Sequence, residues 1–236
     1  MGYFIYDNVN TVAHGITIDG SGAFNAPERD VEMISVPGRN GDIIVDNGRY
    51  LNGELTYAAG ITRDFEENSA WARSFFLSRS TTYHRLTDSY DSEHFRMARY
   101  KGGVEIDPTV LNRSGALNFV FDCKPQRFLF TGDDEQTVTN GSTISNPTMF
   151  DALPLLQIRG VTQNTILTIN GKVIKFLADI ANAKIDCELM DCWNGATYLN
   201  NIIQCAEFPH LSPSANSIAW SGTIAELKIT PRWWEL

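Results

Sequence analysis

The dipeptide Asn-Gly recurs through this sequence and restricts its fold more than any other feature. It occurs six times, beginning at residues 40, 47, 52, 140, 170 and 194. Asn and Gly best tolerate the positive φ angles of a type I′ turn, the tight turn that joins two antiparallel strands. Repeated turns of this kind predict a chain of short hairpins, so we expect a mainly β protein.

The segments between these turns alternate in hydrophobicity as strands do. The clearest predicted hairpin is "TILTINGKVIKF" (165–176), in which two alternating runs flank the Asn-Gly pair. A second predicted hairpin is "FRMARYKGGVEID" (95–107), which bends at its Gly-Gly pair. The stretches "ALNFVFDC" (116–123) and "TIAELKIT" (223–230) alternate like half-buried strands.

One segment, "DFEENSAWARSFFLSRS" (64–80), follows a helical pattern instead. Asp64 is placed to cap it, and Glu67 follows three residues later as in a capping box. Four apolar residues share one face at spacings of four, which predicts that this face packs on a sheet: Trp71, Ala72, Phe75 and Phe76.

A polar, turn-rich stretch at 131–148 is typical of a domain boundary. We therefore predict an N-terminal β domain over residues 1–134, with its helix at about 64–80. Residues 135–236 then form a C-terminal all-β domain of the size of a β-sandwich.

Composition and charge exclude some classes of function. The 236 residues are 43% apolar with a formal net charge of −9, and no run approaches the length of a membrane span. A nucleic-acid binder needs basic patches, and none stands out, so neither sequence-specific nucleic-acid binding nor membrane association is expected. The N-terminus shows no secretory signal, so the four cysteines are expected to be free thiols in a reducing compartment.

The glycine-rich stretch "SVPGRNGDIIVDNGRYLNG" (35–53) raises the alternatives of a phosphate loop and a series of turns. A phosphate loop needs Lys-Ser/Thr after its glycines and then a helix. Here the glycines are followed by "DIIVD", which resembles a strand. Turns are therefore favoured over a ligand loop.

Two groups of residues could form a metal site or a catalytic site. Cys187, Cys192, Cys205 and His210 have a spacing like that of a zinc site. However, "KIDCELMDC" (184–192) reads as one strand, on which residues five apart point to opposite faces, so buried apolar cysteines are favoured. Asp186 and Glu188 have a separation suited to glycoside hydrolysis, but acidic residues opposite an apolar face are ordinary on a solvated sheet. No catalytic residue, metal or cofactor is predicted.

The C-terminal "PRWW" places Trp233 and Trp234 side by side on a possible strand, so one is expected to face inward. The other ring could pack at a domain or subunit contact, or stack on a sugar. Packing is favoured, and both residues are kept as a possible sugar or packing platform.

Six stretches in order along the chain carry a family resemblance: "ERDVEMISVPGRNGDI" (28–43), "HFRMARYKGGVEID" (94–107), "NFVFDCKPQRFLF" (118–130), "NPTMFDALPLLQIRG" (146–160), "KIDCELMDCW" (184–193) and "FPHLSPSANSIAWSGTIAELKITPRWW" (208–234). Together they resemble the distal tail proteins (Dit) of siphophages that infect Gram-positive hosts. The chain departs from the family at Ser214, where relatives often carry glycine.

The resemblance implies a structural protein of the virion at the distal end of the tail, assembled in the host cytoplasm, and not an enzyme. Six copies form a ring in this family. The ring joins the tail tube to the tail-associated hub protein and the receptor-binding or baseplate proteins, and DNA passes through its channel. The C-terminal domain is implied to be a galectin-like or carbohydrate-binding-module-like sandwich. An acidic lumen would repel DNA phosphates.

Within that reading, the predicted subunit interface is the turn formed by Pro37, Gly38, Arg39, Asn40 and Gly41, with Arg39 as a candidate contact. The alternative function is a carbohydrate-binding β-sandwich module that contacts the host cell wall.

Overall fold

The computed structural model describes residues 2–20, 22, 25–109 and 113–236. The chain divides into two compact units: Met1–Arg127 with Leu236, and Phe128–Glu235. The sequence placed its boundary between residues 134 and 135. In the structure the long strand β10 (Ser114–Leu129) continues past residue 127. Its alternation of buried and more exposed residues ends at Cys123, and residues 124–129 are all half-buried.

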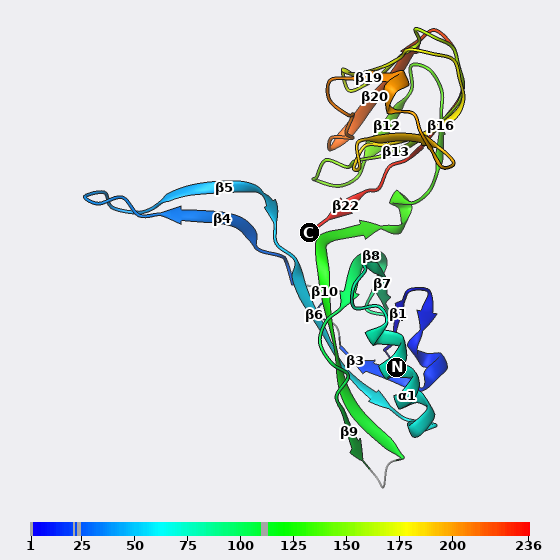
Figure 1. The fold of residues 1–236 in the computed structure, drawn as a ribbon. Helices are drawn as coiled ribbons and strands as arrows, with labels where there is room; N and C mark the ends of the chain where they lie inside the picture. Colours follow the sequence, from blue (N-terminus) through cyan, green and yellow to red (C-terminus); the bar gives the residue numbers. More distant parts are fainter. Residues whose placement is uncertain (1, 21, 23–24, 110–112) are drawn as a thin grey trace. The chain divides into compact units, whose positions relative to one another are not determined.

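Unit 1 is built on one antiparallel sheet with the strand order β2-β1-β7-β8-β10-β6-β3, and β9 pairs with β10 (Figure 1). An isolated bridge between Gly2 and Ile18 of β3 links the two sides, so the sheet curls back on itself. The other strands that unit 1 contributes to this sheet are β1 (Phe4–Tyr6), β2 (Val9–Asn10), β3 (Ile16–Asp19), β6 (Gly53–Ile61), β7 (His84–Asp88), β8 (Asp91–Tyr100) and β9 (Ile106–Thr109).

The core of unit 1 is rich in aromatic rings, and helix α1 (Phe65–Leu77) contributes to it. Phe76 is fully buried and lies 4.4 Å from Phe119 between ring centroids. Trp71 stacks on Phe75 at 4.6 Å, which confirms the predicted apolar stripe. Asp64 precedes the helix with a φ of 45°, but its side chain makes no capping hydrogen bond.

The predicted hairpin over 95–107 is wrong. After β8 the chain turns at Gly102, which has a φ of 94°, and β9 pairs with β10 instead of β8. The Tyr100 hydroxyl donates to the Gly103 carbonyl at 2.8 Å, which holds this turn against the end of β8. Strand alternation predicted the elements here, but not their pairing partner.

Unit 2 is a sandwich of two antiparallel sheets, one six-stranded (β11-β21-β13-β16-β17-β18) and one five-stranded (β12-β20-β14-β15-β19). Its strands and the short β22 are β11 (Gln136–Val138), β12 (Thr143–Asn146), β13 (Leu155–Val161), β14 (Ile166–Ile169), β15 (Lys172–Phe176), β16 (Ile180–Asp186), β17 (Asp191–Asn194), β18 (Thr197–Tyr198), β19 (Ile203–Cys205), β20 (Ser214–Ser221), β21 (Ile224–Thr230) and β22 (Trp234–Glu235). The predicted mainly β class is confirmed.

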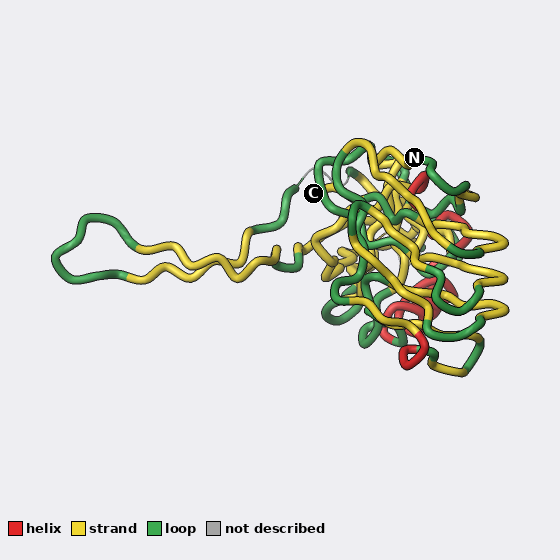
Figure 2. Tube along the Cα trace, turned by 90° about the horizontal axis from the view of Figure 1, so that it is seen from above, coloured by secondary structure: helices red, strands yellow, loops and turns green. Residues whose placement is uncertain are grey.

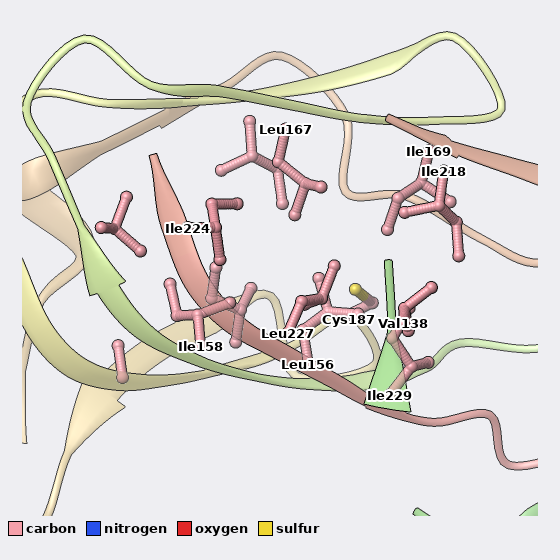
Figure 3. Close-up of a cluster of buried hydrophobic side chains, with 14 of the residues drawn as sticks. Val138, Leu156, Ile158, Leu167, Ile169, Cys187, Ile218, Ile224, Leu227 and Ile229 are labelled. Atoms are coloured by element: carbon pink, nitrogen blue, oxygen red, sulfur yellow. The ribbon is translucent and has the colours of Figure 1, made fainter. Parts of the chain in front are cut away.

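The inner faces of the two sheets form one apolar core (Figure 3). Leu167 and Ile169 of β14 lie opposite Leu156 and Ile158 of β13, and all four side chains are at most 1% exposed. Along β14 every second residue is buried in this way, because successive side chains point to opposite faces of a sheet. The predicted strand over 223–230 is confirmed as β21.

The Asn-Gly signal is confirmed most clearly at 170–171. Asn170 has a φ of 50° and Gly171 a φ of 77°, as a type I′ turn requires, and the turn joins β14 to β15. The Asn170 side chain also accepts a hydrogen bond from the Ser217 N–H at 3.0 Å and donates to the His210 carbonyl at 3.2 Å.

Replacing Gly171 by Ala should lower the free energy of unfolding of unit 2 by about 1–2 kcal/mol. The cost comes from the left-handed backbone alone, since nothing lies within 4 Å of an added Cβ. Gly171→Asn should cost less, because Asn tolerates this conformation. Urea unfolding followed by tryptophan fluorescence measures both, and equal losses would contradict the backbone explanation.

One further prediction, the strand over 184–192, is wrong. Residues 184–192 are not one strand, because β16 ends at Asp186 and a turn leads into β17. The Asp186 carboxylate accepts the N–H groups of Glu188 at 2.9 Å and Leu189 at 3.2 Å, which stabilises the turn. Ser214, where relatives of the resembled family often carry glycine, has a φ of 71°. The glycine-like conformation is therefore kept without the glycine.

Among the described helices, none has the length and apolar character needed to cross a membrane.

Candidate assembly surface

The segment that contains the predicted interface residues is a two-stranded hairpin of unit 1, formed by β4 (Arg29–Ile34) and β5 (Ile43–Tyr50). The two strands pair only with each other in the described part of the chain. Figure 1 shows them as a ribbon with neither face covered by another element of the same unit, and Figure 2 shows the loop that joins them. An isolated two-stranded hairpin is only marginally stable in water, so we expect another protein surface to cover this one.

Ion pairs fix the hairpin near its base. Arg29 donates to both carboxylate oxygens of Asp46 at 2.9 and 2.7 Å, and Arg49 donates to Asp30 at 2.7 Å. Hydrogen bonding from Arg29 holds the pKa of the Asp46 carboxyl below its usual range, and Arg49 does the same for the pKa of Asp30. These links cross between the two strands and hold their register.

Asn47-Gly48 is not a turn, contrary to the prediction. It lies within β5, where Gly48 has a φ of 75° and its N–H donates to the Asp46 side chain at 2.8 Å. The pairing register shifts on the facing strand between Arg29 and Val31. The positive φ of the glycine therefore serves a β-bulge, which increases the local twist of the hairpin.

The five predicted interface residues lie in the loop at the far end of the hairpin. The Arg39 N–H donates to the Val36 carbonyl at 3.1 Å, and Gly38 has a φ of 80°. With Pro37 before the glycine, this is the pattern of a type II turn. Gly41 has a φ of 79°, and the side chains of Arg39 and Asn40 are exposed. The structure brings all five residues together, free of contact with the core.

The larger apolar surface of the hairpin lies in its strands, and sequence reasoning missed it. Met33 is directly opposite Ile44, and Ile34 is directly opposite Ile43, so the two pairs occupy opposite faces. The exposed fractions are 56% for Met33 and 64% for Ile44. Six exposed apolar side chains cover both faces: Val31, Met33, Ile34, Ile43, Ile44 and Val45. The signal was present in the unbroken run Ile43-Ile44-Val45, since such runs are typical of strands covered on both faces.

The two C-terminal tryptophans of unit 2 are engaged in packing. Trp233 is 3% exposed, and its carbonyl accepts the Leu129 N–H at 2.9 Å. Trp234 is half-buried, stacks on Phe150 with a centroid distance of 4.5 Å, and donates its indole N–H to the Asp151 carbonyl at 2.9 Å. Both indoles therefore take part in packing within unit 2.

The carboxylate pair considered in the sequence is tied to a cation. Arg232 donates to both oxygens of Asp186 at 2.8 and 2.7 Å, and it lies 3.5 Å from Glu188. Desolvation would raise the pKa of Asp186, but hydrogen bonds from Arg232 and from the turn N–H groups outweigh it, so the pKa is lowered. Asp186 is therefore an ionised structural anchor, with no proton to donate near neutral pH.

Cys187 and Cys192 are buried in the sandwich core, at 3% and 0% exposure. Among the residues that the structure describes, no group of three or more His, Cys, Asp or Glu side chains is placed to hold a metal ion.

The four thiols should differ sharply in reactivity. Burial raises the pKa of Cys123 to about 12 and that of Cys192 to about 11, and it also raises the pKa of Cys187. Burial raises the pKa of Cys205 as well, but this thiol is only partly buried and so is the most accessible of the four. Because the thiolate is the reacting form, alkylation of the folded protein at pH 8 should label Cys205 first and the others after unfolding. Peptide mass spectrometry gives the order, and early labelling of Cys187 would contradict it.

No family model matches this sequence, and no curated protein matches it. Solved structures do. The crystal structure of SPP1 Dit (gp 19.1), a hub of the adsorption apparatus in phages that infect Gram-positive bacteria, superposes with a TM-score of 0.72 at 13% identity, over 100% of both chains. The chain has a Dit-like fold.

Baseplate structures of phage P2 in its activated conformation also match. With Ca the TM-score is 0.50 at 12% identity, and with Sr it is 0.51 at 10% identity, over 97% of each chain. The similarity to SPP1 Dit covers both units of the chain. At such low identity, the likeness concerns the fold and not individual side chains.

Proposed function

We propose that this protein is a structural distal tail protein of a siphophage, the hub of its baseplate. Six copies form a ring at the distal end of the tail. The ring connects the tail tube to the tail-associated hub protein and to receptor-binding or baseplate proteins, after assembly in the host cytoplasm. The observation that carries the proposal is the full-length match to SPP1 Dit. A galectin-like character of unit 2 is part of the same proposal.

The β4–β5 hairpin supports assembly as the mechanism. It places apolar side chains on both faces, and it offers one unpaired edge on each strand in the described part of the chain. Exposed apolar patches and free strand edges are typical of protein interfaces. A neighbouring copy that covers the hairpin would make a head-to-tail contact, and such contacts form a ring when the rotation from one copy to the next closes. The loop from Pro37 to Gly41 would then enter the same contact.

Charge supports the passage of DNA. The chain has a formal net charge of −9, and a ring of six copies multiplies that charge. An acidic channel wall repels phosphates, so the genome could move without adsorbing to the protein. A ring whose channel is electropositive would contradict this part of the proposal without affecting the hub role.

Electron microscopy of the purified full-length protein, alone and mixed with its tail partners, tests the proposal. The expected result is a six-fold ring with a central channel, accompanied by a hexamer in native mass spectrometry. A protein that stays monomeric at high concentration, and forms no ring with its partners, would overturn it.

A further inference from the structure

The outward face of the six-stranded sheet in unit 2 carries a hollow that the hub role does not use. Its volume is about 420 Å³, and strands β13, β16, β17 and β21 line it. The side chains that matter for the argument are Trp193, Arg159, Asn182, Lys184, Glu226 and Lys228. All of them lie within unit 2, away from the apolar core.

The strand register arranges these side chains in two rows across the sheet. Residues directly opposite each other on neighbouring strands share a face. One row runs Lys228, Gln157, Lys184, Trp193, Tyr198, and the other runs Glu226, Arg159, Asn182. The first row ends in two aromatic rings at the sheet edge, and the second places an amide and a guanidinium beside them.

The aromatic end distinguishes this face from an ordinary solvated one. Trp193 is only half-buried, and its cross-strand neighbour Tyr198 is 70% exposed. The solvated face of an antiparallel sheet commonly carries polar side chains, and here two aromatic rings lie side by side at its edge. An accessible indole offers a flat apolar surface with a polar N–H, a combination suited to a ligand that is apolar on one face and polar at its rim.

The polar residues supply hydrogen bonds of both kinds. Arg159 is 66% exposed and lies 3.3 Å from Glu226, so the pair presents donors and acceptors side by side. Asn182, directly opposite Arg159, adds an exposed amide with one acceptor and two donors. A pyranose ring matches this surface, since its C–H face stacks on an indole while its rim carries neighbouring hydroxyls.

The charges favour a negative substituent on that sugar. Lys228 is paired with Glu135 at 2.7 Å, and Arg159 with Glu226. Lys184 makes no ion pair within the part of the chain that the structure describes, and it lies next to Trp193 across the strands. One unpaired cation beside the stacking surface would attract a carboxylate, sulfate or phosphate group on the ligand.

We propose that this face of unit 2 binds a saccharide. The sugar ring stacks on Trp193, Asn182 and Arg159 hydrogen-bond its hydroxyls, and Lys184 contacts an anionic substituent. The site is distinct from the Trp233–Trp234 pair, whose rings are already packed. The inference does not depend on ring assembly, so the two proposals fail or succeed separately.

An array of neutral, sulfated and uronic-acid oligosaccharides, probed with the full-length protein, tests the inference. The best-bound glycan is then titrated against variants by tryptophan fluorescence. Trp193→Ala and Asn182→Ala should each weaken binding at least 10-fold, and Lys184→Ala should do so for anionic glycans but not for neutral ones. Lys175→Ala, the same change on β15 of the other sheet, is the matched control and should bind normally.

The inference would be overturned if the folded protein bound no glycan, or if a glycan bound equally well to the Asn182→Ala and Lys184→Ala variants. Both of these residues are exposed, so their variants should fold even if Trp193→Ala does not. Inorganic phosphate that displaces every glycan at equal concentration would reduce the site to a simple anion site and would also overturn it.

Discussion

The double substitution Met33→Asp/Ile44→Asp should abolish ring formation and leave a folded monomer. The two side chains are directly opposite each other on one face of the β4–β5 hairpin, at 56% and 64% exposure. In the proposed ring this face is covered, so each new carboxylate would have to be buried without a partner. We expect subunit association to weaken by more than about 100-fold, the range of interface hot spots. Native mass spectrometry and electron microscopy measure the loss.

A matched control is available in unit 2. Leu189→Asp/Met190→Asp makes the same change in charge at two side chains that are each 64% exposed, but in the turn between β16 and β17. That variant should still form rings. Ile34→Asp/Ile43→Asp tests the opposite face of the hairpin. Rings that persist in both hairpin variants, with unchanged stability, would exclude the hairpin as the subunit contact.

Replacing Asp186 by Ala should destabilise unit 2 by about 3–5 kcal/mol, the range found when one partner of a buried ion pair is removed. The Asp186 side chain is 5% exposed and binds Arg232 through both oxygens. Its loss would leave the guanidinium without its main partner and would free two turn N–H groups.

Glu188→Ala is the matched control for Asp186→Ala. Its side chain is 42% exposed and 3.5 Å from Arg232, so it should cost less than about 1 kcal/mol.

The same pair gives a pH signature. The pKa of Asp186 is lower in the folded protein than in the unfolded chain, so the folded state favours the ionised form. Its contribution to stability is therefore complete above the unfolded pKa of about 4 and is lost as the pH falls through the folded pKa. The difference in unfolding free energy between the wild type and Asp186→Asn should shrink from pH 7 to pH 3. A difference that stays constant in urea titrations at both values would contradict the assignment.

Local signals predicted the elements whose geometry depends on nearby residues. The hairpin at 165–176 follows from the backbone freedom of Asn170 and Gly171, and helix α1 follows from the spacing of Trp71, Phe75 and Phe76. The same Asn-Gly signal failed at 47–48. There the outcome depends on the facing strand and its Arg29–Asp46 pair, which sequence spacing does not reveal.

The functional surfaces were harder to predict for a related reason. Trp193 lies beside Lys184, Asn182 and Tyr198 only because of the cross-strand register of β16, β17 and β18. The turn at 187–190 creates this register, but the sequence pattern predicts a continuous strand there. The turn depends on hydrogen bonds that the Asp186 carboxylate accepts from two backbone N–H groups, and hydrophobic alternation does not reveal them. At the hairpin, the glycine pattern predicts an interface in the loop from Pro37 to Gly41, whereas the exposed apolar side chains lie in the two strands.

The two-faced hairpin also has a colloidal consequence. The β4–β5 hairpin exposes six apolar side chains and, in the described part of the chain, two unpaired strand edges. A subunit with such a hairpin can associate out of register before it meets its proper neighbour. Long-range repulsion between subunits, from a net charge of −9, opposes such encounters at low ionic strength. Added salt screens this repulsion, so that its range falls to about 10 Å at 0.1 M, while the attraction between apolar surfaces remains. The unassembled protein should therefore be best kept dilute, at low salt and well above its sequence pI of about 4.9.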